Sequence, residues 1–295
     1  MLKFRERLIE RLLVKPGTRV DLGRDFDPAY TAHYVKKEDA EVLLGEGIQR
    51  LAEYQDKFWA QNTYGLLVIL QAMDAAGKDG VIKHVMSGLN PQGCQVSSFK
   101  APSPEELGHD YLWRDSRVLP ERGRIGIFNR SYYEEVLVVR VHPEVLQQQQ
   151  LPEALRSKKI WERRFEEINC FERYLSQNGI LVLKFFLYLS REEQKRRFMT
   201  RIDTPEKNWK FSSADIRERR YWNEYMKAYE DMLSHTSTPE APWHIVPADH
   251  KWFTRLAVAE VIIQKFVDID PQYPKLTAAR KKELAKAREW LEQEG

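Results

Sequence analysis

A strand, a loop of small residues and a helix follow one another at residues 66–86, and this succession constrains the fold most. The apolar run 66–70 is typical of a buried strand, and apolar residues recur at helical spacing from Val81 to Met86. Strand, Gly-Lys loop and helix form the layout of a phosphate-binding P-loop, in which backbone N–H groups and a lysine bind anionic oxygens. We therefore predict that phosphate binds to the loop residues Ala75, Ala76, Gly77, Lys78, Asp79 and Gly80.

The loop departs from the usual pattern G-x-x-x-x-G-K-[ST] at two positions. Gln71 stands where the first glycine is expected, and Asp79 replaces the hydroxyl residue that normally holds Mg²⁺. Asp74, a carboxylate four residues before Lys78, is the best candidate to hold the metal instead. The alternative without function is a strand-to-helix turn that carries a lysine by chance.

Composition excludes several classes of protein. The 295 residues, 42% of them hydrophobic, suffice for one large α/β domain or two small ones. A net charge of +3 is too small for a histone-like polycation, and two cysteines are too few for a disulfide framework. No stretch approaches the roughly 20 apolar residues of a membrane span, and the charged N-terminus does not resemble a secretory signal. We expect a cytoplasmic protein without a membrane or nucleic-acid partner.

Strand and helix patterns alternate along the chain. We expect strands at 66–71, 95–99, 124–129, 180–189 and 243–246, and helices at 37–60, 157–177, 252–267 and 277–293. Ser103 and Ser190 each begin a capping box, and the helix after Ser103 should end before Pro120. Residues 1–40 are predicted to form an irregular N-terminal arm. The alternation predicts a parallel sheet with helices on both faces.

Two polar segments follow the carboxyl ends of predicted strands. Asp74 comes after the first strand, and Asn129-Arg130 comes directly after the third. Because ligands of such sheets bind at the carboxyl ends of the strands, we expect both segments to line one cleft.

Residues 191–220 carry an excess of positive charge. Ten basic side chains stand against six acidic ones, and Asp203-Thr204-Pro205 divides the segment into two helical parts. In a P-loop kinase a basic lid closes over the phosphates and supplies arginines to the transition state. For any single arginine a solvated helix face is the simpler interpretation, but the cluster as a whole favours an anionic partner.

Three segments together resemble the polyphosphate kinase 2 family. They are Met73–Gly80, Ile127–Val136 and Pro205–Phe211, and the resemblance extends from about residue 25 to about residue 270. It implies an α/β P-loop kinase fold, a three-layer sandwich with a lid. We expect one domain over 1–295 with the lid at 191–235, and the composition of the last segment predicts a C-terminal helix at 277–293. It also implies reversible phosphoryl transfer between inorganic polyphosphate and nucleotides, with Mg²⁺ or Mn²⁺.

The resemblance also assigns roles to residues. Asp74 and Lys78 match the catalytic pair of the Walker A loop, and Asn129-Arg130 closes the Walker B strand. Most members have Asp where this chain has Asn129. Asn129 followed by Glu134 and Glu135 is similar to the subfamily that phosphorylates both AMP and ADP, giving ADP and ATP. Glu134 then becomes a second candidate metal ligand.

The remaining assignments are hypotheses. Lys78, Lys83 and Arg130 would contact the transferring phosphates, and the candidate lid and nucleotide residues are Asn129, Arg196, Arg197, Arg201 and Lys210. A homo-oligomer, dimer or tetramer, is plausible because such sheets often assemble through helix faces. Two alternatives stay open: a nucleoside-monophosphate-type kinase that uses ATP, and a non-catalytic polyanion-binding protein on a P-loop scaffold.

Overall fold

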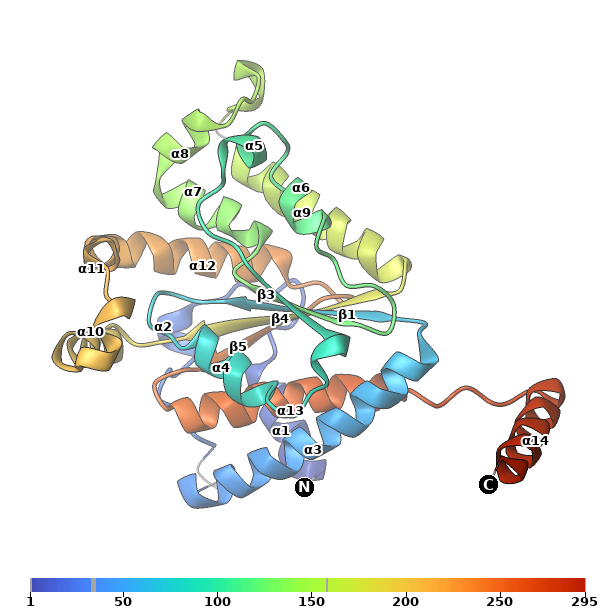
Figure 1. Cartoon of the computed structure of the whole chain (residues 1–295). Coiled ribbons are helices and arrows are strands. Elements are labelled where there is room, and N and C mark those ends of the chain that lie inside the picture. Colours follow the sequence, from blue (N-terminus) through green and yellow to red (C-terminus); the bar gives the residue numbers. More distant parts are fainter. Residues whose placement is uncertain (1, 33–35, 158, 295) are drawn as a thin grey trace.

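A single parallel sheet forms the centre of the molecule. The computed structural model describes residues 2–32, 36–157 and 159–294 (Figure 1). The strand order is β2-β3-β1-β4-β5, and every neighbouring pair is parallel. The strands are β1 (Gly65–Gln71), β2 (Cys94–Ser98), β3 (Ile125–Asn129), β4 (Ile180–Tyr188) and β5 (Trp243–Pro247). All five lie within one residue of their predicted bounds, and the predicted α/β class is confirmed.

Helices cover both faces of the sheet and complete three layers (Figure 1). One face carries α1 (Leu2–Leu12), α3 (Lys37–Gln61), α4 (Lys78–Val85) and α13 (Lys251–Ile269). The other carries α7 (Val138–Val141), α9 (Ile160–Gln177), α12 (Trp222–Thr236) and the 3₁₀ turn η2 (Tyr132–Val136). Within the described chain, helices of the length and apolarity needed to traverse a bilayer do not occur.

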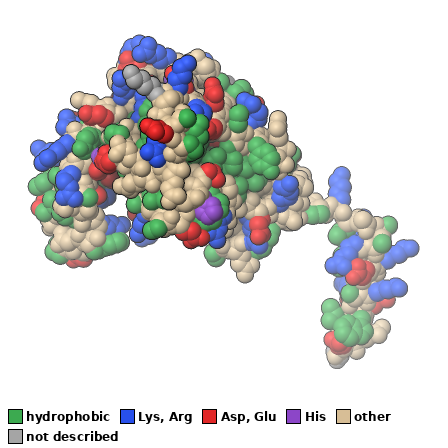
Figure 2. Space-filling view, turned by 90° about the horizontal axis from the view of Figure 1, so that it is seen from above, with side chains coloured by type: hydrophobic (Ala, Val, Ile, Leu, Met, Phe, Trp, Pro, Cys, Tyr) green, Lys and Arg blue, Asp and Glu red, His purple; other side chains and the backbone are tan. Residues whose placement is uncertain are grey.

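Shorter elements connect these layers. They are α2 (Leu22–Asp25), α5 (Pro104–Leu107), α6 (Trp113–Ser116), α8 (Pro143–Gln148), α10 (Arg191–Asp203) and α11 (Ser213–Glu218), with the 3₁₀ turns η1 (Pro91–Gly93), η3 (Glu153–Leu155), η4 (Pro205–Lys210) and η5 (Arg219–Tyr221). The basic segment 191–220 is therefore two helices joined through Thr204 and η4, as predicted. The last helix, α14 (Ala278–Gln293), projects away from the body (Figures 1 and 2).

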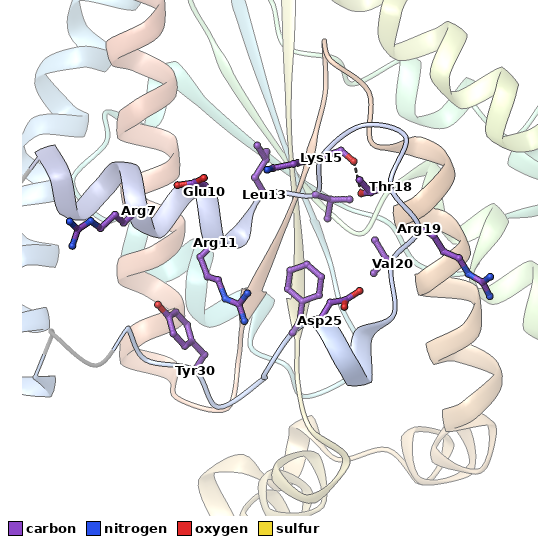
Figure 3. Close-up of a pocket in the computed structure, with 12 residues that line it drawn as sticks. Arg7, Glu10, Arg11, Leu13, Lys15, Thr18, Arg19, Val20, Asp25 and Tyr30 are labelled. Atoms are coloured by element: carbon purple, nitrogen blue, oxygen red, sulfur yellow. Dashed lines mark hydrogen bonds between the residues drawn. The ribbon is translucent and has the colours of Figure 1, made fainter.

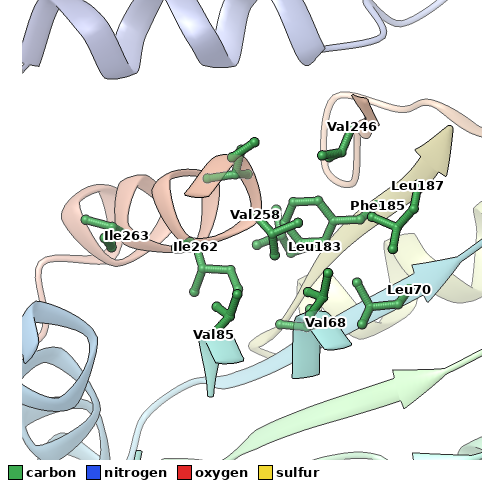
Figure 4. Close-up of a cluster of buried hydrophobic side chains, with 14 of the residues drawn as sticks. Val68, Leu70, Val85, Leu183, Phe185, Leu187, Val246, Val258, Ile262 and Ile263 are labelled. Carbon is green, nitrogen blue, oxygen red and sulfur yellow. The ribbon is translucent and has the colours of Figure 1, made fainter. Parts of the chain in front are cut away.

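Alternate residues of the strands enter two separate cores. Val68 and Leu70 face the α13 layer, whereas Leu67 and Ile69 face the α9 and α12 layer. In Figure 4 the first set packs with Val85 and with Val258 and Ile262 of α13. All seven residues of β1 are buried, so the strand that leads into the P-loop is held on both faces.

The prediction of an irregular N-terminal arm was wrong. The described part of residues 1–40 contains α1 and α2, and Leu8 and Leu12 are fully buried in the core beside α13. Arg5 is also buried, because its guanidinium group forms an ion pair with Glu260 of α13. A helix with this many charged side chains becomes stable only by packing against a distant part of the chain.

The single helix expected between Ser103 and Pro120 was also wrong. The capping box at Ser103 is present, but α5 ends at Leu107 and a separate α6 follows. Asp110 accepts a hydrogen bond from the Leu112 backbone N–H, and this turn separates the two helices. At the second predicted capping box, Ser190 caps α10 as expected, whereas the Glu193 carboxylate binds Arg196 and Arg197 instead of returning to the helix N-terminus.

Candidate active site

The P-loop lies at the carboxyl end of β1, and its backbone conformation depends on two residues with positive φ. Ala75 has φ +64° and Gly77 has φ +111°, which turns the chain sharply before α4 begins at Lys78. Arg197 of α10 donates to the carbonyl oxygens of Ala75 (3.0 Å) and Ala76 (2.8 Å). The same guanidinium group reaches the carbonyl of Ala248 after β5. Arg197 thus holds the peptide groups of the loop in fixed orientations through their carbonyl oxygens.

Arg130 lies between the P-loop and the segment after β3. Its φ of +68° aims the side chain back toward β1, where Nη2 lies 2.6 Å from Asp74 Oδ1. Its Nη1 lies 3.1 Å from Glu134 Oε2. The Glu134 and Asp74 carboxylates hold the pKa of Arg130 above its usual value, despite the opposing effect of burial. The two carboxylates predicted as metal ligands are therefore bridged by a permanent cation.

Each departure from the usual loop sequence has a partner in the structure. Gln71 is fully buried, and its side-chain amide donates to Glu134 Oε1 (2.9 Å) and accepts from the Ser131 N–H (3.1 Å). Asp79 accepts from the Asn129 side-chain amide (2.9 Å). Both contacts tie the loop after β1 to the residues after β3.

A buried polar network supports the residues that follow Arg130. Lys184 of β4 and Glu172 of α9 are fully buried and form an ion pair of 2.6 Å. The hydroxyl groups of Tyr132 and Tyr133 both donate to Glu172 Oε1, at 2.8 Å and 2.7 Å. Lys184 Nζ also donates to the Thr236 carbonyl (2.7 Å), so each buried charge has several hydrogen bonds. The network anchors η2 to the sheet and thereby fixes the backbone next to Arg130.

A cavity of about 730 Å³ opens above the P-loop. It is lined by ten cations and two carboxylates, Asp74 and Asp79. The predicted site residues that line it are Asp74, Ala75, Ala76, Gly77, Lys78, Asp79, Gly80, Asn129, Arg130, Arg196, Arg197, Arg201 and Lys210. Two distant segments of the chain, the P-loop and the basic segment, thus meet around one cavity with a strongly cationic lining.

Two predicted residues lie elsewhere. Lys83 is exposed on α4 and does not line this cavity. Glu134 lines a neighbouring pocket, and its carboxylate is directed at Arg130 and Gln71. Of the arginines proposed for the lid, Arg197 is buried against backbone carbonyls, whereas the Arg196 side chain is 67% exposed. Arg201 is partly neutralised by Asp215 at 3.4 Å.

Sequence reasoning missed the cations at the start of α13. Lys251 and Arg255 lie one helical turn apart and line the cavity beside the basic segment. Burial and the nearby Arg197 lower the pKa of Lys251, as expected where cations crowd together. The sequence did contain a signal for these two residues, because both follow the carboxyl end of β5. Asp74 and Arg130 were predicted from the same kind of position, at the same edge of the sheet. Lys100, Lys207 and Trp209 also line the cavity.

A second pocket of about 390 Å³ adjoins the first. The two share Phe99, Lys100 and Arg130 in their linings. Apolar side chains line much of the second pocket, among them Leu107, Val138, Val139 and Val145, and polar groups such as Glu106 and Gln149 stand among them. Its size and mixed lining are typical of a small-molecule site.

A third hollow, of about 620 Å³, lies along the N-terminal segment (Figure 3). Its lining includes Arg7, Arg11, Lys15 and Arg19. In Figure 3, however, Arg7 and Arg19 point away from each other at opposite ends. The basic groups therefore do not converge on one position as they do above the P-loop.

A metal ion would have few protein ligands here. Among the residues that the structure describes, no three His, Cys, Asp or Glu side chains form a metal-binding group. Asp74 supplies a carboxylate at the wall of the cationic cavity. This donor set fits Mg²⁺, which is commonly bound by one or two carboxylates together with substrate phosphates and water.

Comparison with known proteins decides the family. The family model for polyphosphate kinase 2 (PPK2) matches residues 34–275. The chain belongs to the PPK2 family. It is 52% identical to an ADP-polyphosphate phosphotransferase of Rhodopseudomonas palustris, over 94% of this chain and 96% of that protein. It is 40% identical to an AMP/ADP-polyphosphate phosphotransferase of Meiothermus ruber, over 93% and 98%.

A crystal structure supports the same conclusion. Polyphosphate kinase 2 from Arthrobacter aurescens TC1 superposes with a TM-score of 0.82 at 39% identity, and the match covers 93% of this chain and 98% of that one. The resemblance inferred from three motifs is thereby confirmed, and this PPK2 chain is an enzyme of the transferase class. The range matched by the family model includes every residue of the cationic cavity but neither α1 nor α14.

The P-loop lysine of this PPK2 chain should make activity sensitive to pH. Lys78 Nζ donates to the Ala72 carbonyl (2.8 Å), and burial together with Arg130 lowers the pKa of Lys78 to about 8. Below this pH the side chain is charged, and above it the free enzyme loses a cation from the cavity above the P-loop. We expect kcat/KM for the phosphate donor to fall as pH rises through about 8, since kcat/KM reports the free enzyme.

A matched variant tests this assignment. Lys78→Arg keeps a positive charge at every accessible pH, because guanidinium does not titrate in this range. Its kcat/KM should be lower but should no longer decline around pH 8. An unchanged decline in Lys78→Arg would assign the titration to another group.

Proposed function

We propose that this chain transfers the terminal phosphate of inorganic polyphosphate to AMP and ADP, giving ADP and ATP, in a reversible reaction. The observation that carries the proposal is the cavity above the P-loop, where ten cations face two carboxylates beside a second, more apolar pocket. The relatives named for ADP and for AMP/ADP support this substrate class.

We place polyphosphate in the cationic cavity. A linear polyanion needs positive charge along its length. The cations come from three parts of the chain: the P-loop (Lys78), the basic segment (Arg196, Arg201, Lys207, Lys210) and α13 (Lys251, Arg255). Residues 191–235 would act as the lid of a single P-loop kinase domain. Closure of the basic segment would exclude water and bring further arginines to the phosphates.

We place the nucleoside part of the acceptor in the second pocket. Arg130 lines both volumes, so a phosphate bound at this guanidinium group would lie where donor and acceptor meet. Asp74 and Glu134 hold the group from opposite sides, which leaves it little freedom to rotate. Phosphoryl transfer depends mainly on such alignment and on charge neutralisation. The acceptor phosphate is already ionised, so the reaction needs no strong general base.

A divalent metal, Mg²⁺ or Mn²⁺, completes the proposal. Asp74 would hold it at the wall of the cavity, and Glu134 is a second candidate. When bound, the metal neutralises phosphate oxygens in the transition state. The residues of the chain position the substrates: Lys78 and the loop N–H groups bind the donor, Arg130 aligns the two phosphates, and Arg197 holds the loop in place.

The decisive experiment supplies Mg²⁺, long-chain polyphosphate and either AMP or ADP, and resolves the nucleotides by chromatography. Formation of ADP and ATP from AMP would support the proposal in full. ATP from ADP alone would restrict the acceptor. Activity with ATP and AMP, but none with polyphosphate, would identify an ATP-dependent kinase. Bound polyphosphate without any product would indicate a binding protein.

The α13 cations should bind the donor. Replacing Lys251 or Arg255 by Gln removes a positive charge from the cavity. We expect KM for polyphosphate to rise about tenfold in each variant, because a tenfold change corresponds to the binding free energy of one weak charged contact. The KM for the nucleotide should change less. Lys227→Gln, an equal change at an exposed position of α12, is the control. An unchanged KM for polyphosphate in both α13 variants would remove these residues from the donor site.

Asn129 is the proposed determinant of acceptor choice. It donates to Asp79, and an aspartate at this position would place two carboxylates against each other. Asn129→Asp should therefore displace Asp79 and shift the ratio of kcat/KM for AMP to that for ADP. An unchanged ratio, measured with both acceptors at one polyphosphate concentration, would show that Asn129 does not set this preference.

A further inference from the structure

The side chain of His142 contacts the end of α11, which is distant in the sequence. His142 lies between α7 and α8, and its Nε2 is 2.9 Å from Oε2 of Glu218, the last residue of α11. The Tyr225 hydroxyl group of α12 donates to the same oxygen (2.8 Å). The imidazole ring also packs in a T-shaped arrangement on the ring of Tyr221, with 4.8 Å between the centroids. The end of α11 is therefore held both by the α7–α8 corner and by α12.

The contact between His142 and Glu218 is available to both protonation states of the ring. A carboxylate oxygen only accepts, so Nε2 must carry a proton and donate to Glu218. The other ring nitrogen, Nδ1, faces a second carboxylate oxygen, Glu144 Oε1, at 3.2 Å. The imidazolium form donates to both carboxylates, and the neutral form with its proton on Nε2 still donates to Glu218. The His142 side chain is only 14% exposed, so water competes little for this bond.

The residues on either side of His142 form a wall of the second pocket. Val139 of α7 and Val145 of α8 line that pocket, as does Gln149 directly after α8. Gln149 donates to Glu135 Oε2 (2.7 Å), so the far end of α8 is attached to η2. A molecule that fills the pocket contacts the chain before and after His142, and it therefore restricts the position of the imidazole ring.

The residues that precede α11 carry part of the lining of the cationic cavity. Lys207, Trp209 and Lys210 of η4 line the cavity, and residues 211–212 join η4 to α11. Every residue of η4 and α11 is at least partly exposed, and Trp209 is 78% exposed. Few buried contacts therefore hold these two elements in place. The attachment of Glu218 restrains the end of α11 and thereby the cations that come before it.

We propose that His142 and Glu218 are positioning residues that couple the two substrate sites. A nucleotide in the second pocket fixes the α7–α8 corner, and His142 then holds Glu218, together with α11 and η4, in one position. Polyphosphate bound at η4 acts on the pocket through the same contact, because coupling between two sites is reciprocal. The inference rests on the proposed function, which assigns the nucleotide to the second pocket and polyphosphate to the cationic cavity.

Hydrogen exchange of the ligand-free protein tests whether the contact restrains the segment. His142→Leu removes the donor to Glu218 and changes no residue of the segment itself. We expect the backbone amides of residues 205–218 to exchange about threefold faster in this variant, the effect of losing one neutral hydrogen bond. The amides of β1 should keep their wild-type rates. His235→Leu, the same substitution at an exposed position of α12, is the control. Wild-type exchange of residues 205–218 in His142→Leu would overturn the proposal.

Calorimetric titration with AMP tests the coupling. The titration is run without and with saturating long-chain polyphosphate, in EDTA, so that no divalent metal supports phosphoryl transfer. In the wild type we expect polyphosphate to lower the Kd of AMP by about fivefold or more, a typical coupling between two sites. In His142→Leu this factor should fall to about one, while the Kd of AMP alone stays within about twofold of the wild type.

Two further variants separate coupling from a general loss of structure. The amide of His142→Gln can still donate to Glu218, so this variant should retain most of the coupling factor. His142→Leu combined with Glu218→Leu should lose no more coupling than either change alone, since both remove the same contact. Binding of both ligands with a wild-type coupling factor in His142→Leu would overturn the inference and leave the proposed function intact. A wild-type protein that binds neither ligand would contradict the proposed function and the coupling together.

Discussion

Asp74→Asn is expected to lower kcat by about 10²- to 10³-fold, the usual cost of removing one electrostatic group from a preorganised site. Asp74 is one of the two carboxylates that line the cationic cavity, and its Oδ1 lies 2.6 Å from Arg130. The neutral amide would bind a metal ion more weakly, and it would replace the ion pair with Arg130 by a weaker contact. The measurement is kcat with polyphosphate and ADP, together with the Mg²⁺ concentration that gives half-maximal rate, which should rise.

The fold should tolerate this change. The Asp74 side chain is 27% exposed, so its replacement buries no new unpaired charge. We expect the midpoint of urea unfolding to stay within error of the wild type. Near-normal turnover in a fully folded Asp74→Asn variant would remove Asp74 from the mechanism and leave Glu134 as the remaining candidate metal ligand.

Glu172→Leu is expected to produce the largest loss of stability, about 3–5 kcal/mol of unfolding free energy. The change leaves the fully buried Lys184 ammonium without its counter-charge and leaves the hydroxyl groups of Tyr132 and Tyr133 without their acceptor. Because these tyrosines anchor the chain next to Arg130, kcat should fall as well. Urea unfolding followed by circular dichroism measures the loss.

Two controls define the origin of that loss. Glu166→Leu, the same substitution at an exposed position of α9, should change stability by no more than about 0.5 kcal/mol. The double variant Glu172→Leu with Lys184→Met removes both charges and should recover much of the loss, since no unpaired ion is left buried. A double variant as unstable as Glu172→Leu would show that packing and the tyrosine hydroxyls, not the ion pair, dominate.

The sequence alone predicted those elements whose pattern lies within a short stretch of the chain. The five strands are short apolar runs bounded by turn residues, and the P-loop combines such a run with small residues and Lys78. Residues from two segments were expected in one cleft because the carboxyl ends of parallel strands share an edge, and Asp74 and Arg130 do lie in contact.

Features that depend on distant partners could not be read in this way. From its sequence, α1 looks like a solvated arm. In the structure, Arg5 forms an ion pair with Glu260 and Leu8 is buried in the core. Arg197 looked like any other cation of the basic segment, yet its environment consists of carbonyl groups from two other loops. The role of Lys184, a charge within an apolar strand, likewise depends on Glu172 and Thr236.

The contacts of Arg197 determine which part of the basic segment is free to move. This side chain joins α10 to the carbonyls of Ala75, Ala76 and Ala248, and Gln194, also on α10, donates to the Asp74 carbonyl (2.9 Å). A rotation of all of α10 would break every one of these bonds and distort the P-loop itself. If the basic segment closes over substrates as proposed, α10 would therefore stay in place and η4 and α11 would move. That motion would have to release Asn208 from the Arg201 and Ile202 carbonyls and Asp215 from Arg201.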